Sequence, residues 1–114
     1  YALAVGGGYV YSGSADRTVR KISSSGAEVW SFTGHKGAVE AVAVDNNGNV
    51  YSGGRLRTVR KIDPNGAEVW SFTGHTDVVE AVAVDNNGNV YSGSRDETVR
   101  KLIFKLDVEV KIIA

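Results

Sequence analysis

Three residues in the second half of the chain could form the hydrogen-bonded catalytic triad of a hydrolase. They are His75, Ser92 and Asp96. In such enzymes a histidine removes the proton of a serine hydroxyl while a carboxylate orients the imidazole ring. The serine also needs an oxyanion hole, and many hydrolases present it on a G-x-S-x-G turn. The sequence contains no such turn, so we expect no catalytic residue and predict that the chain is not an enzyme.

Two acidic, asparagine-rich segments resemble the start of a calcium-binding loop. They are residues 45–49 and 85–89, both with the letters DNNGN. An EF-hand loop carries a glutamate at its twelfth position, where this chain has Leu56 and Asp96. Asn and Gly tolerate positive φ, so the same letters are typical of a tight turn between two strands. We therefore predict hairpin turns and no metal site.

Aromatic and basic side chains recur at fixed positions. An Arg-Lys pair occurs at residues 20–21, 60–61 and 100–101. We expect one member of each pair to pack its stem at an interface, with a ring that binds an anion as the alternative. We interpret the repeated aromatic residues as packing groups, with a sugar-binding platform as the alternative. These aromatic residues are Trp30, Phe32, Trp70 and Phe72.

An internal repeat of 40 residues positions all these groups. Residues 81–93 repeat residues 41–53 letter for letter, and we expect Tyr1 to correspond to Ala41 and Ala81. A period of this length predicts a repeat architecture in which each unit packs on its neighbours. The near identity of the units indicates recent duplication or deliberate construction.

Each unit predicts four short strands and no helix. In the second unit the strands are expected at residues 39–45, 50–53, 58–62 and 68–72, with turns rich in Asn, Gly and Pro between them. The third unit departs from the pattern after Lys101. Alternating apolar residues there predict a final strand that either completes this unit or extends onto another chain; they are Val108, Val110 and Ile112.

The repeated motifs resemble those of the WD-repeat β-propeller family. Gly-His precedes the first strand at 34–35 and 74–75, Ser-Gly-Ser lies in the second strand at 12–14 and 92–94, and an aspartate follows. The tryptophans, however, lie in the fourth strand, as in quinoprotein-type propellers. Both families imply an all-β fold, a β-propeller of four-stranded antiparallel blades. The chain would hold about three blades, with limits at residues 1–34, 35–74 and 75–114.

The resemblance also implies roles for individual residues. In WD-repeat blades such His, Ser and Asp side chains form a structural network that holds the loops, and here its members would be His75, Ser92, Asp96, His35 and Asp16. The second unit cannot complete the network because Leu56 replaces the aspartate. Leu56 and its neighbours Arg55 and Arg57 form an exposed turn, which is either a candidate contact for a partner or sequence drift.

Composition limits the partners. Thirteen Lys and Arg balance thirteen Asp and Glu, so no long-range field recruits nucleic acid or an anionic membrane. No cysteine is present, which excludes disulfides and thiolate metal sites but leaves the compartment open. No apolar run approaches the ~20 residues that span a bilayer, and no signal peptide is recognisable. The chain lacks Met and begins within a repeat, so we expect a piece of a longer protein.

Three blades leave two apolar blade faces uncovered. We therefore expect oligomerisation to complete the ring, with a homodimer of six blades favoured and a trimer of nine as the other closed form. The predicted function is a non-catalytic scaffold that binds an unknown protein partner and needs no cofactor. The alternatives are a fragment of a quinoprotein-like enzyme and a sugar-binding propeller lectin. Nothing in the sequence indicates the localisation.

Overall fold

The computed structural model is built from three four-stranded antiparallel sheets. It describes the backbone of residues 2–105 and 109–113 and the side chains of residues 2–102, and these residues contain no helix. This confirms the predicted all-β fold of four-stranded blades. Within the same residues there is no helix long and apolar enough to cross a membrane.

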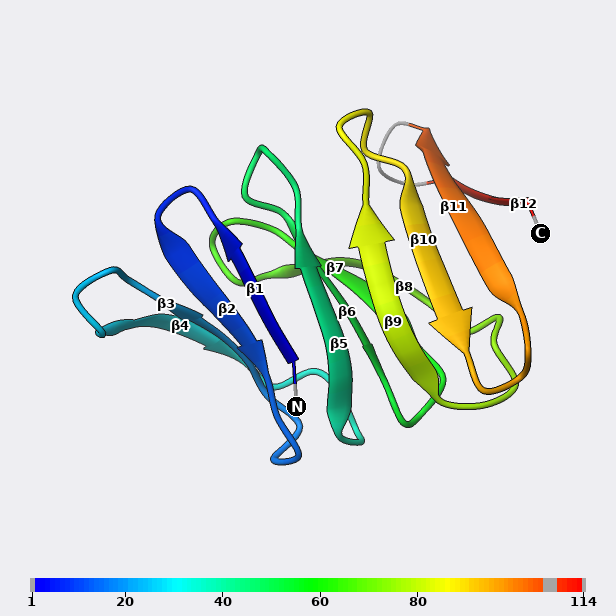
Figure 1. Cartoon of the computed structure of the whole chain (residues 1–114), viewed down its shortest axis with the longest axis horizontal. Helices are drawn as coiled ribbons and strands as arrows, with labels where there is room; N and C mark the ends of the chain where they lie inside the picture. Colours follow the sequence, from blue (N-terminus) through cyan, green and yellow to red (C-terminus); the bar gives the residue numbers. More distant parts are fainter. Residues whose placement is uncertain (1, 106–108, 114) are drawn as a thin grey trace.

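Each blade is formed by four strands that are consecutive in the chain (Figure 1). The first blade contains β1 (Ala2–Gly6), β2 (Tyr9–Gly13), β3 (Val19–Ile22) and β4 (Glu28–Phe32). The second contains β5 (Val39–Val44), β6 (Val50–Gly54), β7 (Val59–Ile62) and β8 (Glu68–Phe72). The third contains β9 (Val79–Val84), β10 (Val90–Ser94), β11 (Val99–Lys105) and β12 (Glu109–Ile113). The predicted blade limits at residues 34/35 and 74/75 stay a prediction, because they fall in the connections between sheets.

Local sequence explains the alternation of strands and turns. Branched and aromatic residues fill the strands, where their side chains pack on a pleated surface. In the turn after β5 the Asp45 carboxylate accepts hydrogen bonds from the amides of Asn47 and Asn49, each at 2.9 Å. Gly48 there has a φ of 84°, which glycine adopts without strain. The segment is thus a hairpin turn, as its letters predict.

The first blade has a shorter opening turn than the sequence comparison predicts. Ala2 pairs with Gly13, just as Ala41 pairs with Gly53 in the second blade. The expected correspondence of Tyr1 with Ala41 is therefore wrong by one residue. The cause is the turn at residues 6–9, where one residue fewer connects the two strands than in the second blade.

The last strand completes the third blade. β12 pairs antiparallel with β11, from Lys101 opposite Ile113 to Lys105 opposite Glu109. This decides the alternative that the sequence left open. Val108, which belonged to the same prediction, lies outside the described residues.

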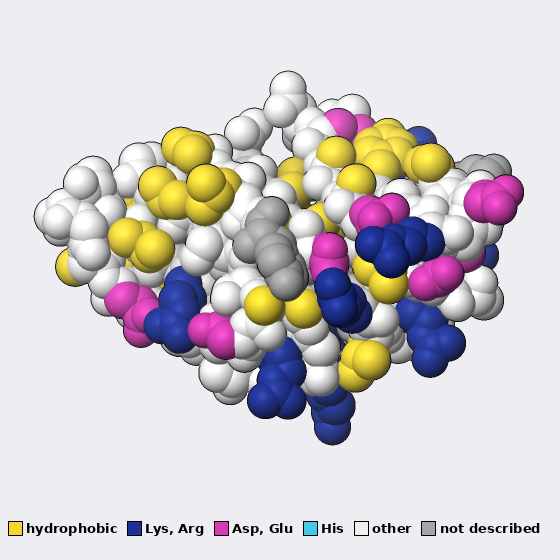
Figure 2. Space-filling view, turned by 60° about the horizontal axis from the view of Figure 1, so that its bottom comes forward, with side chains coloured by type: hydrophobic (Ala, Val, Ile, Leu, Met, Phe, Trp, Pro, Cys, Tyr) yellow, Lys and Arg dark blue, Asp and Glu magenta, His cyan; other side chains and the backbone are white. Residues whose placement is uncertain are grey.

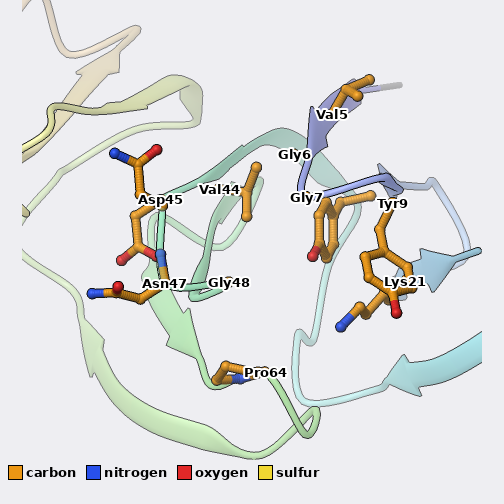
Figure 3. A pocket seen from close by; sticks show the side chains of 12 residues that line it. Val5, Gly6, Gly7, Tyr9, Lys21, Val44, Asp45, Asn47, Gly48 and Pro64 are labelled. Carbon is orange, nitrogen blue, oxygen red and sulfur yellow. The ribbon is translucent and has the colours of Figure 1, made fainter.

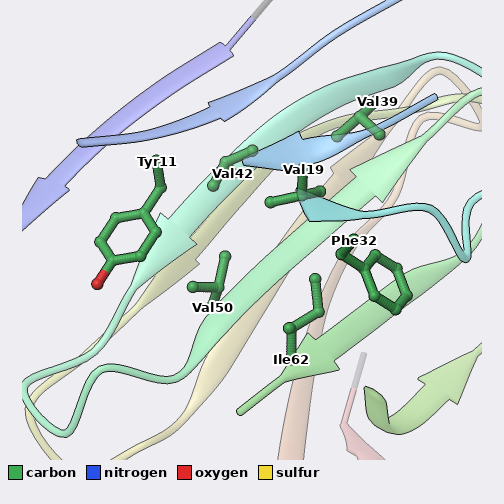
Figure 4. Packing of buried hydrophobic residues seen from close by; sticks show 7 residues of the cluster. All are labelled: Tyr11, Val19, Phe32, Val39, Val42, Val50 and Ile62. Carbon is green, nitrogen blue, oxygen red and sulfur yellow. The ribbon is translucent and has the colours of Figure 1, made fainter. Parts of the chain in front are cut away.

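The core lies between the sheets. The inner strands β1, β5 and β9 lie side by side along the 40 Å axis of the molecule (Figure 1). One apolar cluster fills each space between neighbouring blades. Figure 4 shows the cluster between the first two blades, formed by Tyr11, Val19, Phe32, Val39, Val42, Val50 and Ile62. The second cluster contains Tyr51, Val59, Val79, Val90 and Leu102.

Candidate functional site

In the third blade the structure brings together the three residues of the triad-like series. Nε2 of His75 lies 2.6 Å from Oγ of Ser92, and Nδ1 lies 2.9 Å from Oδ2 of Asp96. An ionised carboxylate only accepts hydrogen bonds, so Nδ1 carries a proton and donates it to Asp96. His75 and Ser92 are buried, with 3% and 1% of their surface exposed. A serine this deeply buried cannot reach a substrate, so the geometry favours a structural role over hydrolysis.

A tight turn holds Asp96 in place. Its carboxylate accepts hydrogen bonds from the amide and hydroxyl of Thr98 and, at 3.0 Å, from the amide of Thr76. Led by the Thr98 hydroxyl, these bonds and that of His75 hold the pKa of Asp96 well below its usual range. The carboxylate therefore connects the turn before β11 to the segment that enters β9.

The second blade contains the same histidine and serine without the acid. Nε2 of His35 lies 2.6 Å from Oγ of Ser52, and both residues are buried. Leu56 occupies the position of Asp96 in the equivalent turn and is 47% exposed. Burial, together with the positive charge of Arg60, lowers the pKa of His35 to about 4. His35 is thus a neutral, buried imidazole with no carboxylate on its second nitrogen.

The first blade contributes the acid Asp16, and the position equivalent to His35 would precede Tyr1. Asp16 accepts hydrogen bonds from the amide of Thr18, at 3.0 Å, and from its hydroxyl, at 2.5 Å. It also pairs with Arg20 at 3.4 Å. Hydrogen bonds from Thr18 lower the pKa of Asp16, an exposed carboxylate. Of the five predicted network residues, the structure therefore connects His75, Ser92 and Asp96 and leaves His35 and Asp16 in separate arrangements.

The aromatic residues of the fourth strands lie at the contacts between blades. The indole nitrogen of Trp30 donates a hydrogen bond to the carbonyl of Pro64 in the next blade, at 3.0 Å. A Cβ added to Gly66 would lie 2.9 Å from Cγ of Trp30, so the ring covers that turn. Phe32 is buried and meets the His35 ring edge-on, with centroids 6.0 Å apart.

The aromatic residues of the second blade have a similar arrangement. The rings of Trp70 and Tyr51 lie 6.2 Å apart and those of Phe72 and His75 6.4 Å apart, and both Trp70 and Phe72 pack against the second core cluster. This placement disfavours a sugar-binding platform built on Trp30 and Trp70.

The turn at residues 55–57 lies on the surface, beside the segment that enters β5. Arg55 forms an ion pair with Glu40 at 2.7 Å, and its side chain is 58% exposed. A Cβ added to Gly37 would lie 3.0 Å from Cγ of Leu56, so the two loops touch. Arg57 has a φ of 67°, and Arg17 and Glu97 have similar values at the equivalent positions. All three turns therefore share one backbone shape.

Charged side chains of both signs alternate on the face shown in Figure 2. Among the side chains that the structure describes, no group of three or more His, Cys, Asp or Glu residues is placed to hold a metal ion. A cavity between the first two blades contains Lys21 and Tyr11, and sequence reasoning did not identify it. Comparison of the turns in correct register would have indicated it, because Gly6 stands where the other blades have Asp45 and Asp85.

Comparisons with known proteins agree with this architecture. A PQQ-type family model described as "Outer membrane protein assembly factor BamB" matches residues 15–105. Two similar solved structures are titled "Structure of U3-55K", with a TM-score of 0.88 and 24% identity, and "Crystal structure of RRP9 WD40 repeats", with 0.84 and 26%. They cover 97% and 88% of this chain, which spans 36% and 32% of theirs. No curated protein matches the chain.

Both parts of the predicted resemblance are thereby confirmed. The solved structures are WD-repeat propellers, and the family model fits the quinoprotein-like position of the tryptophans. The chain spans about a third of each of these structures, so their fold is shared and their activities are not transferred.

Proposed function

Since the chain belongs to the family described as outer membrane protein assembly factor BamB, we propose that it is a non-catalytic β-propeller module. In this proposal a second copy of the chain completes the ring, and the loops bind other proteins. The observation that supports this proposal is the exposure of apolar residues on the two outermost blade faces. Each face is one half of the interface that the chain forms twice within itself.

The open face of the third blade, here called the tail face, is an uncovered copy of two covered surfaces. Val19 and Val59 are fully buried against the following blade, whereas the equivalent Val99 is 70% exposed. The tail face consists of Ala81, Ala83, Tyr91, Gly93 and Val99. Water therefore covers a surface whose two counterparts are packed.

The open face of the first blade, here called the head face, is the complementary half. Leu3 is 74% exposed, and the equivalent Val42, which packs against the first blade, is 8% exposed. Val5 is likewise 74% exposed. The head face consists of Leu3, Val5, Val10 and Ile22.

The glycines of the second strands show how closely two blades approach. A Cβ added to Gly13 would lie 2.6 Å from Cγ1 of Val39, and one added to Gly53 would lie 2.5 Å from Cγ1 of Val79. The equivalent Gly93 has only Cβ of Ala81 nearby, at 3.8 Å. A third blade-to-blade contact of the same kind thus has room at the tail face.

Contact of head and tail faces is heterologous, so it must close into a ring or continue as a filament. Two chains would place six blades around the axis, within the usual range of four to eight, and three chains would place nine. We propose the dimer. The loops at residues 36–37, 55–57 and 76–77 would then surround one end of the ring and present the surface for a protein partner.

Light scattering after size exclusion tests the assembly. We expect twice the mass of the 12.1 kDa chain at several dilutions. Val99→Asp and Leu3→Asp should each give monomers because a buried, unpaired charge at either face disfavours association. Val29→Asp is the matched control, since Val29 is 49% exposed on the outer strand β4 and belongs to neither face.

Mixing the two interface variants tests whether the contact joins a head face to a tail face. The Val99→Asp variant has an intact head face and the Leu3→Asp variant an intact tail face. An equimolar mixture should therefore form a dimer through one head-to-tail contact. If two tail faces met each other instead, Leu3→Asp alone would remain dimeric. A native chain that is monomeric at all concentrations would refute self-assembly and would leave both faces for other blades of a longer protein.

A further inference from the structure

A cavity of about 370 Å³ opens between the first and second blades (Figure 3). It lies beside the turn that follows β5, whereas the loop at residues 36–37 precedes β5. The opening turn of the first blade forms one wall, with Gly6, Gly7 and Tyr9. The turn after β5 and Pro64 of the second blade form the other. Its volume lies in the range of small-molecule sites, roughly 300–1,000 Å³.

In the other two blades an aspartate lies beside the equivalent tyrosine. The Tyr51 hydroxyl donates a hydrogen bond to Asp45 at 2.9 Å, and the Tyr91 hydroxyl donates one to Asp85 at 3.1 Å. The equivalent tyrosine of the first blade is Tyr11. Val5 pairs with Val10 as Val44 pairs with Val50, so Gly6, which follows Val5, stands at the position of Asp45. No carboxylate of its own blade is therefore available to Tyr11.

Gly6 cannot simply be replaced by the missing acid. A Cβ at this position would lie 2.8 Å from Cγ1 of Val44, closer than real Cβ contacts. The space beside Tyr11 consequently stays open in this backbone arrangement.

Tyr11 lines the cavity, and its hydroxyl has no partner among the described residues. Only 1% of the residue is exposed, and its hydroxyl forms no hydrogen bond with any residue that the structure describes. Burial, with smaller contributions from Tyr9 and Asp45, raises the pKa of Tyr11, so the phenol remains a protonated donor. A donor in a residue with so little exposed surface normally has an acceptor, and the cavity leaves space for one.

Lys21 lies directly across the ladder from Tyr11 and brings a positive charge to the same cavity. Its ammonium group is 4.1 Å from the centre of the Tyr9 ring, and it has no ion pair with the described residues. Asp45 is the acid in the cavity wall, and its oxygens already accept bonds from two amides, the Asn49 side chain and Tyr51. Lys21 is therefore free to pair with an added anion.

We propose that this cavity binds a small carboxylate, which takes the place of the aspartate side chain found in the other two blades. The Tyr11 hydroxyl donates to one carboxylate oxygen and the Lys21 ammonium pairs with the other. Val44 and Pro64 line the remaining wall and favour a ligand with a short apolar body. The site lies within one chain, so it does not depend on the assembly proposed above.

Titration of the ¹⁵N-labelled protein with butyrate tests the site, with butanamide as the uncharged control ligand. We expect saturable shifts of the amide signals of residues 5–9 and 44–48, with a Kd on the order of 1 mM for a ligand of this size. Butanamide should bind at least tenfold more weakly, because a bond to a charged group exceeds a neutral one in strength. Equal binding of both ligands would overturn the proposal.

Two variants and a matched control locate the binding groups. Tyr11→Phe and Lys21→Gln should each weaken butyrate binding at least tenfold. Lys101→Gln makes the same change as Lys21→Gln at the equivalent position of the third blade and should leave the affinity unchanged. Retention of binding in both cavity variants would refute the assignment. Amide spectra of the free variants confirm that each is folded, and Tyr11→Phe is expected to unfold like the native chain because it breaks no hydrogen bond.

Discussion

Leu56→Asp should stabilise the protein by restoring the network of the second blade. The backbone is already suitable, because Arg57 and Glu97 have φ values of 67° and 70° at equivalent turn positions. The new carboxylate would meet Thr58, the amide of Lys36 and the free nitrogen of His35, as Asp96 meets their counterparts. Removing a leucine that is 47% exposed costs about 1 kcal/mol, and a bond to a charged group contributes about 1.5–3 kcal/mol. We expect a net gain of about 1 kcal/mol, or ~5 °C in Tm.

The gain should grow as the pH falls. The folded state holds His35 at a pKa of about 4, whereas an unfolded histidine titrates near 6.5. Between these values the unfolded chain binds a proton that the folded chain does not, so stability decreases as the pH falls from 6.5 to 4, by roughly 3 kcal/mol in total. A carboxylate at residue 56 favours the protonated ring and raises the pKa of His35. The loss should therefore be smaller in the variant.

Urea unfolding of both proteins at pH 7.0 and 5.0 measures these effects, and NMR titration of the His35 ring measures its pKa directly. Leu56→Asn is the control, since it can accept the same amide bonds without a negative charge. A gain for Leu56→Asp that is no larger at pH 5.0 than at pH 7.0 would contradict the electrostatic reasoning. Destabilisation at pH 7.0 would show that the turn does not place the acid beside His35.

Two further predictions concern the backbone. Gly53→Ala should destabilise the chain by about 1–3 kcal/mol in urea unfolding, because its Cβ would lie 2.5 Å from Val79. Gly93→Ala should leave the stability of the monomeric Leu3→Asp variant nearly unchanged and should weaken self-association of the native chain. An equal loss of stability from both substitutions would contradict the packing described. Arg57→Gly should raise stability by about 1 kcal/mol, since glycine adopts a φ of 67° without the steric cost of a side chain; an unchanged or lower unfolding midpoint would show that the loss of the side chain outweighs this relief.

The strands and turns were predictable because local rules agree with the fold throughout the repeats. The segment with letters VEAVAV has the composition of a buried strand, and the segment DNNGN that follows has the preferences of a turn. The first blade was harder, since three glycines at residues 6–8 conceal a turn that is one residue shorter. A shift of that size changes which side chains are equivalent, and with it the comparison that locates the cavity.

The candidate site was only partly predictable for a related reason. The approach of His75, Ser92 and Asp96 follows from their repeated spacing and the resemblance. The differences in burial between blades depend on which neighbouring blade covers each face, and identical repeat sequences cannot specify this. Ala41 is buried and Ala81 exposed although each begins the same run of thirteen residues, because only Ala41 has a following blade in the chain. Burial here is a property of position in the array.

The pairing of β12 with β11 determines how chains in a ring could exchange. In a ring closed by a strand shared between chains, separation would require breaking a ladder of backbone hydrogen bonds. Here each blade completes its own ladder, so neighbouring copies would meet through side chains alone. Subunits could then leave and rejoin as folded units, at a rate set by desolvation of the two faces. Isotopically light and heavy dimers should accordingly form mixed dimers under native conditions, without passing through the unfolded state.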